Sequence, residues 1–76
     1  MTTAEIKEII KGHPVREIES IIDDYIHSSR NRELAKRTIL SGEKYEPLSE
    51  EFELTPRQVA NIVKAARKII LEHIET

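Results

Sequence analysis

The chain has 76 residues, of which 38% are hydrophobic and 34% charged, with a formal net charge of −2. This length supports one small domain with a thin core, so residues 1–76 are treated as a single helical domain. Cysteine is absent, which excludes disulfides and thiolate chemistry. The longest apolar run is only three residues, Ile69 to Leu71, and excludes a membrane span. The start of the chain lacks the basic and apolar regions of a signal peptide, so we expect a cytoplasmic protein.

Two helices rich in isoleucine are expected in the N-terminal helical segment, residues 1–29. Thr2 or Thr3 can cap the first helix, and Thr2 and Glu5 have the spacing of a capping box. Pro14 then opens a second helix. Its apolar stripe consists of Val15, Ile18, Ile21, Ile22, Tyr25 and Ile26. The first helix has an apolar face of Ile6, Ile9 and Ile10. The two stripes offer more apolar face than a small core needs, so a homodimer through residues 1–29 is one hypothesis.

A third helix is expected from about Arg32 to Ser41, after a break at residues 28–31, and it ends at Gly42. Residues 30–41 hold four bases against Glu33 alone. These bases are Arg30, Arg32, Lys36 and Arg37, named here the Arg30–Arg37 cluster. Such a charge run is often only a solvated helix face, with Glu33 and Arg37 as a pair four residues apart. The alternative is a surface that meets phosphates.

Residues 45–68 have the pattern of two helices joined by a tight turn. The first helix runs from about Glu46 to Phe52, the turn covers residues 53–55, and Thr55 caps a second helix that begins at Pro56. Leu54 is expected to cover the turn, and Phe52 and Val59 are expected to be buried where the helices cross. The helix-turn-helix core is therefore assigned to residues 30–76, within a bundle of four to five helices.

The second helix of this pair is depleted of negative charge. Residues 55–68 contain four bases and no acid, whereas residues 42–54 contain five acids and one base. Helical spacing places five polar side chains on its outward side: Arg57, Gln58, Asn61, Lys64 and Lys68. This layout is typical of DNA-reading helix-turn-helix proteins: a short helix, a turn, and a longer helix that carries Arg, Gln, Asn and Lys outward.

Residues 42–59 also carry a more specific pattern. It is an aromatic residue, an aliphatic and a small residue, two acids, an apolar residue, an aliphatic–Thr pair and a later valine. The positions are Tyr45, Leu48, Ser49, Glu50, Glu51, Phe52, Leu54, Thr55 and Val59. The segment resembles the last helix-turn-helix of sigma-factor region 4 and its relatives, which include response-regulator output domains and small phage-type transcriptional regulators. Ser49 stands where that family usually has alanine. Glu53 stands where it often has a glycine with positive φ.

The resemblance and the charge pattern together predict a sequence-specific DNA-binding protein, a transcriptional regulator with the helix from Pro56 in the major groove of double-stranded DNA. The expected base-reading residues are Arg57, Gln58 and Asn61, because arginine can bond guanine and a carboxamide can bond adenine bidentately. The expected phosphate contacts are Arg30, Arg32, Lys36, Arg37, Lys64, Arg67 and Lys68. The alternative is a helical protein-interaction module that binds RNA polymerase or another regulator without reading DNA.

Catalytic and metal chemistry have weaker support. Asp23 and His27 are four residues apart on one helix, but a metal needs further ligands and none is near in sequence. The adjacent acids, Asp23 with Asp24 and Glu50 with Glu51, point in different directions from a helix and do not converge on a substrate. We therefore expect no enzyme activity, no metal and no cofactor.

Overall fold

The computed structural model describes residues 2–74, which form five α-helices and one π-helical turn and contain no strand. The elements are α1 (Thr3–Lys11), α2 (Val15–Tyr25), α3 (Ser29–Ala35), the π-helical turn η1 (Lys36–Leu40), α4 (Tyr45–Glu51) and α5 (Pro56–Ile74). This confirms the prediction of a small all-α bundle. None of these helices is long and apolar enough to cross a membrane.

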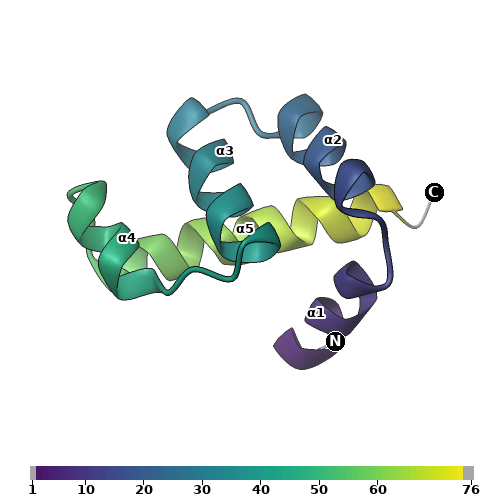
Figure 1. Cartoon of the computed structure of the whole chain (residues 1–76), viewed down its shortest axis with the longest axis horizontal. Helices are drawn as coiled ribbons and strands as arrows, with labels where there is room; N and C mark the ends of the chain where they lie inside the picture. The colour runs from purple at the N-terminus through teal and green to yellow at the C-terminus, as the bar shows by residue number, and fades with distance from the viewer. Residues whose placement is uncertain (1, 75–76) are drawn as a thin grey trace.

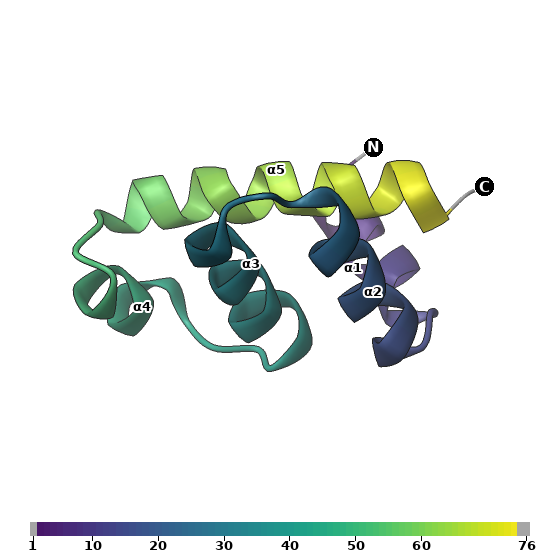
Figure 2. The ribbon, with the colours of Figure 1, turned by 90° about the horizontal axis from the view of Figure 1, so that it is seen from above.

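The longest helix, α5, is the element on which the other four helices pack. Figure 1 shows α4 beside its N-terminal end, α2 near its C-terminal end and α3 between them. In Figure 2, α2, α3 and α4 all lie on one side of α5. Within residues 2–74, the side of α5 turned away from these three helices is free of them, and α1 packs on α5 from below in Figure 1.

Two hydrophobic clusters hold the bundle together. One joins the N-terminal helices to the C-terminal half of α5, and its buried members are Ile10, Ile18, Ile21, Ile22, Ile26, Ala35, Ala66 and Ile70. The other joins α3 and α4 to the N-terminal half of α5 through Leu34, Leu48, Val59 and Val63. Ile39 packs against both clusters. The helix-turn-helix and the N-terminal segment therefore share one continuous core.

The isoleucine stripes of residues 1–29 are used inside the molecule. Their most buried members face α5 and α3 in the first cluster. Val15 and Tyr25, expected in the same stripe, are instead 60% and 47% exposed, and the ring of Tyr25 stacks on His73 at 3.6 Å between centroids. The surplus of apolar surface that motivated a homodimer through residues 1–29 is therefore reduced to a few side chains such as Val15 and Tyr25, and the homodimer stays a prediction.

Side-chain caps explain where α1 and α3 begin. The hydroxyl of Thr2 accepts from the backbone N–H of Glu5 at 3.2 Å, and the Glu5 carboxylate accepts from the backbone N–H of Thr2 at 3.3 Å. This is the predicted capping box. Ser28 caps α3 in a similar way, by accepting from the N–H of Asn31 at 3.2 Å. As a result α3 begins at Ser29, three residues before the predicted start, because residues 28–31 form a cap and a first turn.

The third helix ends in a widened turn. In η1, the hydroxyl of Thr38 donates to the carbonyl of Leu34 at 2.7 Å, a carbonyl that a regular helix would give to a backbone N–H. The backbone N–H of Ser41 donates to Lys36, five residues earlier, at 3.2 Å. Gly42 follows with φ of +70°, a backbone conformation that is unfavourable for any residue with a side chain. A Cβ at this position would meet no atom within 4 Å, so the requirement for glycine comes from the backbone alone.

Candidate nucleic-acid interface

The helices α4 and α5 meet through fully buried aliphatic side chains. Leu48 and Val59 are both 0% exposed and belong to the same cluster. Phe52 and Leu54 pack against this cluster but are only half-buried. The prediction that Phe52 is buried at the crossing is therefore wrong, since Leu48 is fully buried there and the Phe52 ring is only partly covered. Val59 is buried as expected.

The turn between α4 and α5 is held by its backbone. Glu53 has φ of +56°, a left-handed conformation. The family that this segment resembles often has a glycine at this position. The backbone N–H of Leu54 then donates to the carbonyl of Ser49 at 2.8 Å. These two features end α4 and bring the chain directly to the start of α5.

A capping box closes the start of α5. The hydroxyl of Thr55 accepts from the backbone N–H of Gln58 at 3.1 Å, and the side-chain oxygen of Gln58 accepts from the backbone N–H of Thr55 at 2.8 Å. Thr55 is therefore the predicted cap, and Gln58 is its reciprocal partner. Because the oxygen of Gln58 already accepts the capping bond, bidentate pairing with adenine would use its second lone pair or require the side chain to turn away from Thr55.

The uncovered side of α5 carries a row of polar side chains, defined here as the α5 row: Arg57, Asn61, Lys64 and Lys68. At 100° per residue these four positions fall within an arc of roughly 60°, opposite the buried face of the helix, and extend over about 16 Å. All four side chains are exposed. Within residues 2–74 none of them makes a side-chain hydrogen bond or ion pair. The α5 row is therefore available to a ligand.

The Arg30–Arg37 cluster has a different environment. Arg32 donates from Nη1 to the carbonyls of Ile26 and His27, at 2.8 Å and 3.0 Å. These carbonyls lie where α2 ends, so Arg32 satisfies backbone acceptors that the helix leaves unpaired. Arg30 is exposed, and its Nε donates to Asn31 at 3.2 Å. Of the four bases, Arg30 is the one that lies most in solvent.

Lys36 and Arg37 are bonded to acids from other elements. Lys36 Nζ lies 2.7 Å from Asp23 Oδ1, and this hydrogen bond raises the pKa of Lys36. Arg37 donates to both oxygens of Glu51 and both oxygens of Glu43. Hydrogen bonds to the carboxylates of Glu51 and Glu43 raise the pKa of Arg37, and its guanidinium lowers the pKa of each glutamate. The expected pairing of Arg37 with Glu33 does not occur, because Arg37 turns toward α4 instead.

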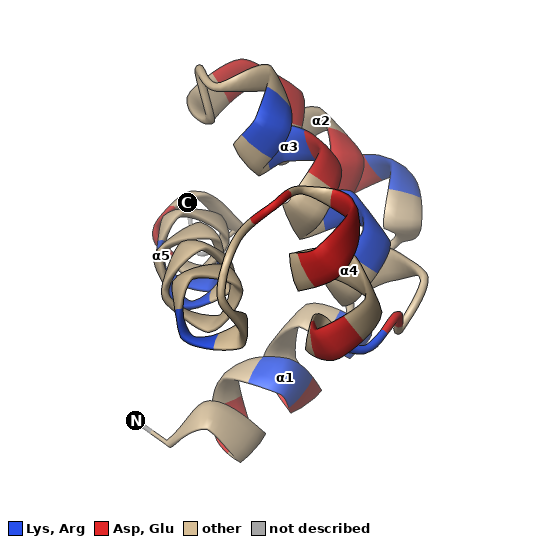
Figure 3. Cartoon of the chain, turned by 90° about the vertical axis from the view of Figure 1, so that its left-hand side faces the viewer, with Lys and Arg blue, Asp and Glu red and all other residues tan. Residues whose placement is uncertain are grey.

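The bases predicted to contact DNA are thus divided between two environments. The α5 row is free, whereas Arg32, Lys36 and Arg37 join α3 and η1 to α2 and α4. Figure 3 shows acids on α4 next to the near turns of α5, where the charged residues are basic. Arg67 is half-buried and lies on the flank of α5 rather than in the row. The sequence could not reveal this division, because it depends on contacts between helices.

Comparisons with known protein families, with curated proteins and with solved structures found no match. Within residues 2–74 there is also no group of three or more His, Cys, Asp or Glu side chains that could hold a metal ion. Asp23, which has metal-ligand spacing with His27, has its carboxylate on Lys36. The α5 row is therefore the candidate site that the geometry defines.

Proposed function

We propose that this chain binds double-stranded DNA sequence-specifically as a transcriptional regulator, with the N-terminal half of α5 in the major groove. The observation that carries the proposal is the α5 row, an exposed line of three bases and one asparagine that have no side-chain partners among residues 2–74. The major groove, about 12 Å wide, admits an α-helix. The likeness of residues 42–59 to sigma-factor region 4 and phage-type regulators supports the same function, in a cytoplasmic protein.

Position along α5 suggests what each member of the row contacts. Arg57 and Asn61 lie nearest the helix N-terminus, which is the end that recognition helices present to base edges. Arginine suits guanine and asparagine suits adenine. Lys64 and Lys68 lie farther along the helix and suit phosphates. Gln58 retains its amide hydrogens for a contact while its oxygen caps the helix.

The internal ion pairs change the expected phosphate contacts. Arg30 remains exposed for such a contact. Arg32, Lys36 and Arg37 would have to give up hydrogen bonds to meet phosphates. We therefore assign these three a supporting role, in which they fix the helix-turn-helix on the rest of the bundle. The proposed phosphate contacts are then Arg30, Lys64 and Lys68.

The rival function is a protein-interaction module that binds RNA polymerase or another regulator. Acids on α4 and in the turn after it favour this rival, because Glu46, Glu50 and Glu53 are exposed and repel phosphates. Selection of bound sequences from random duplex DNA at low and high salt separates the two functions. Enrichment of a defined site, with affinity that falls as salt rises, supports DNA reading. Failure to retain any duplex at low salt contradicts it and favours the rival.

A further inference from the structure

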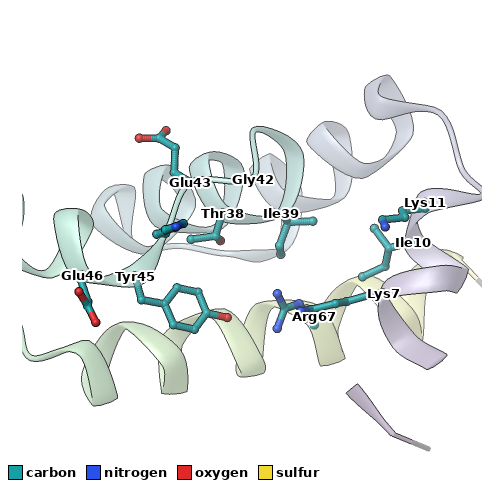
Figure 4. A pocket seen from close by; sticks show the side chains of 11 residues that line it. Lys7, Ile10, Lys11, Thr38, Ile39, Gly42, Glu43, Tyr45, Glu46 and Arg67 are labelled. Carbon is teal, nitrogen blue, oxygen red and sulfur yellow. The ribbon is translucent and has the colours of Figure 1, made fainter. Parts of the chain in front are cut away.

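We propose that a trough beside α5 binds an acidic segment of a partner protein that also carries apolar side chains. The trough has a volume of about 630 Å³ and lies between α1, η1, residues 42–46 and the flank of α5. Figure 4 shows its lining side chains. Its lining residues all lie outside the α5 row, so this inference goes beyond the proposed DNA binding.

The trough combines an apolar floor with basic walls. Ile10, Ile39 and Tyr45 supply the apolar surface. The bases come from three parts of the chain, since Lys7 and Lys11 lie on α1, Lys44 precedes α4 and Arg67 lies on α5. An occupant with both carboxylates and apolar side chains matches this surface.

Positive charge dominates the trough. The side chains of Lys7, Lys11, Lys44 and Arg67 make no ion pair or hydrogen bond within the part of the chain that the structure describes. Two acids also line the trough: Glu46, and Glu43, whose carboxylate binds Arg37 at 2.9 Å. Arg37 also binds Glu51, so it neutralises Glu43 only in part, and four bases face two acids. Complementary charge therefore favours an acidic partner.

The placement of the bases favours an extended occupant over a compact anion. In Figure 4, Lys7 and Lys11 lie toward one end, Tyr45 and Glu46 toward the other, and the guanidinium of Arg67 lies between them. Lys44 adjoins Tyr45 in sequence, so basic side chains occur along the whole length of the trough. A single carboxylate or phosphate would reach only one of these groups. A peptide segment can place successive acidic side chains along the trough and an apolar one on its floor.

The trough and the α5 row can be occupied at the same time. At 100° per residue, Arg67 lies about 60° around the helix axis from Lys64 and about 120° from Asn61. The trough therefore adjoins the row at Lys64 and faces away from Asn61. A protein with this arrangement would hold DNA on the free side of α5 and an acidic partner on its flank.

Selection of short random peptides on the immobilised full chain, followed by affinity measurements on the enriched peptides, tests the proposal. We expect the enriched peptides to contain several Asp or Glu residues and a large apolar residue. Lys7→Glu and Lys44→Glu, at the two ends of the trough, should each weaken binding about tenfold or more. Arg16→Glu, a charge reversal on α2 outside the trough, should leave the affinity for the peptides unchanged. Amide resonances of Thr38, Ile39 and Gly42 should shift as peptide is added.

Several outcomes would overturn the proposal. Enriched peptides without acidic residues, or an equal loss in Arg16→Glu, would remove the trough as the site. Sensitivity to Lys7→Glu alone, with competition by inorganic phosphate, would indicate a compact anion instead. If no acidic peptide binds and both trough variants weaken binding to a selected duplex, the trough belongs to the DNA contact. Arg57→Ala keeps the two proposals separate, because it should reduce DNA binding and leave peptide binding intact.

Discussion

Arg37 in η1 donates hydrogen bonds from its guanidinium to both carboxylate oxygens of Glu51 in α4, with Nη2 at 2.9 Å from Oε1. The same guanidinium binds Glu43 and lies 5.8 Å from the centroid of the Phe52 ring. One side chain thus joins the helix before the pair to the first helix of the pair. This relationship is the reason why we assign a supporting role to Arg37, a base that the sequence predicts at phosphates.

The Arg37 contacts predict a specific loss of stability in acid. Hydrogen bonds from Arg37 lower the pKa of Glu43 and of Glu51 below the ordinary value of 4.5. Carboxylates with a lowered folded-state pKa stabilise the fold above their ordinary pKa, and this stabilisation is lost as pH falls through the folded-state pKa. We therefore expect the melting temperature of the wild type to fall more steeply below pH 4.5 than that of Glu51→Gln. Glu50 neighbours Glu51 but does not contact Arg37. Glu50→Gln should therefore show the same fall of melting temperature with pH as the wild type. Identical slopes for all three proteins would contradict the account.

The capping box at the start of α5 predicts that Thr55 and Gln58 act as a pair. Thr55→Ala should lower the free energy of unfolding by about 0.5–2 kcal/mol, because it leaves a backbone N–H of the first turn unpaired. Gln58→Ala should lower it by less, and the two losses should not add in the double variant. Asn61→Ala, on the exposed α5 row, should keep the free energy of unfolding within about 0.5 kcal/mol of the wild-type value. Denaturant unfolding of these variants checks the prediction, and additive losses would show that the two residues act separately.

Burial at the helix crossing predicts that Leu48 matters more than Phe52. Leu48 is 0% exposed, whereas the Phe52 ring is half-buried. Leu48→Ala should cost about 2–5 kcal/mol, and Phe52→Ala should cost less than the 3–5 kcal/mol typical of a buried aromatic ring. Thermal and denaturant unfolding measure both changes. A larger loss for Phe52→Ala than for Leu48→Ala would place the ring at the centre of the crossing.

The backbone of the turn predicts a stabilising substitution. Glu53 has φ of +56°, which costs a residue with a side chain about 1–2 kcal/mol relative to glycine. Glycine loses more conformational freedom on folding, which offsets about 0.5–1 kcal/mol of this gain. Glu53→Gly should therefore raise the free energy of unfolding by about 0.5 kcal/mol. Glu50→Gly, within α4, should lower it by about 1 kcal/mol. A loss of stability in Glu53→Gly would contradict the observed turn.

Local features of this fold were predictable from sequence, since they depend on residues close in the chain. The capping box of Thr2 with Glu5 and the cap at Thr55 follow from spacings of three residues. The positive φ at Glu53 was anticipated from the glycine in the resembling family. Short-range chemistry of this kind is visible in one sequence because the partners lie within one helical turn.

Features that depend on tertiary contacts were not predictable from sequence. Lys36 and Arg37 belong to a basic run of the kind that can bind phosphates. Lys36 instead pairs with Asp23, 13 residues away in sequence, and Arg37 pairs with Glu51, 14 residues away. One local feature was missed as well: the Thr-x-x-Gln spacing of Thr55 and Gln58 signals a capping box, but Gln58 was expected only to read bases. The trough was missed because its lining comes from four separate parts of the chain.

Binding of point variants to one selected duplex and one scrambled duplex tests the central claim, DNA reading by the α5 row, most directly. Arg57→Ala and Asn61→Ala should each cost about 1–3 kcal/mol on the selected duplex and little on the scrambled one. Lys64→Ala and Lys68→Ala should weaken both duplexes alike and reduce the salt slope by about one unit each. Arg16→Ala, an exposed arginine on α2, should change neither. If all four α5 variants bind like the wild type while Arg32→Ala or Lys36→Ala abolishes binding in a folded protein, α5 is not the helix that reads DNA.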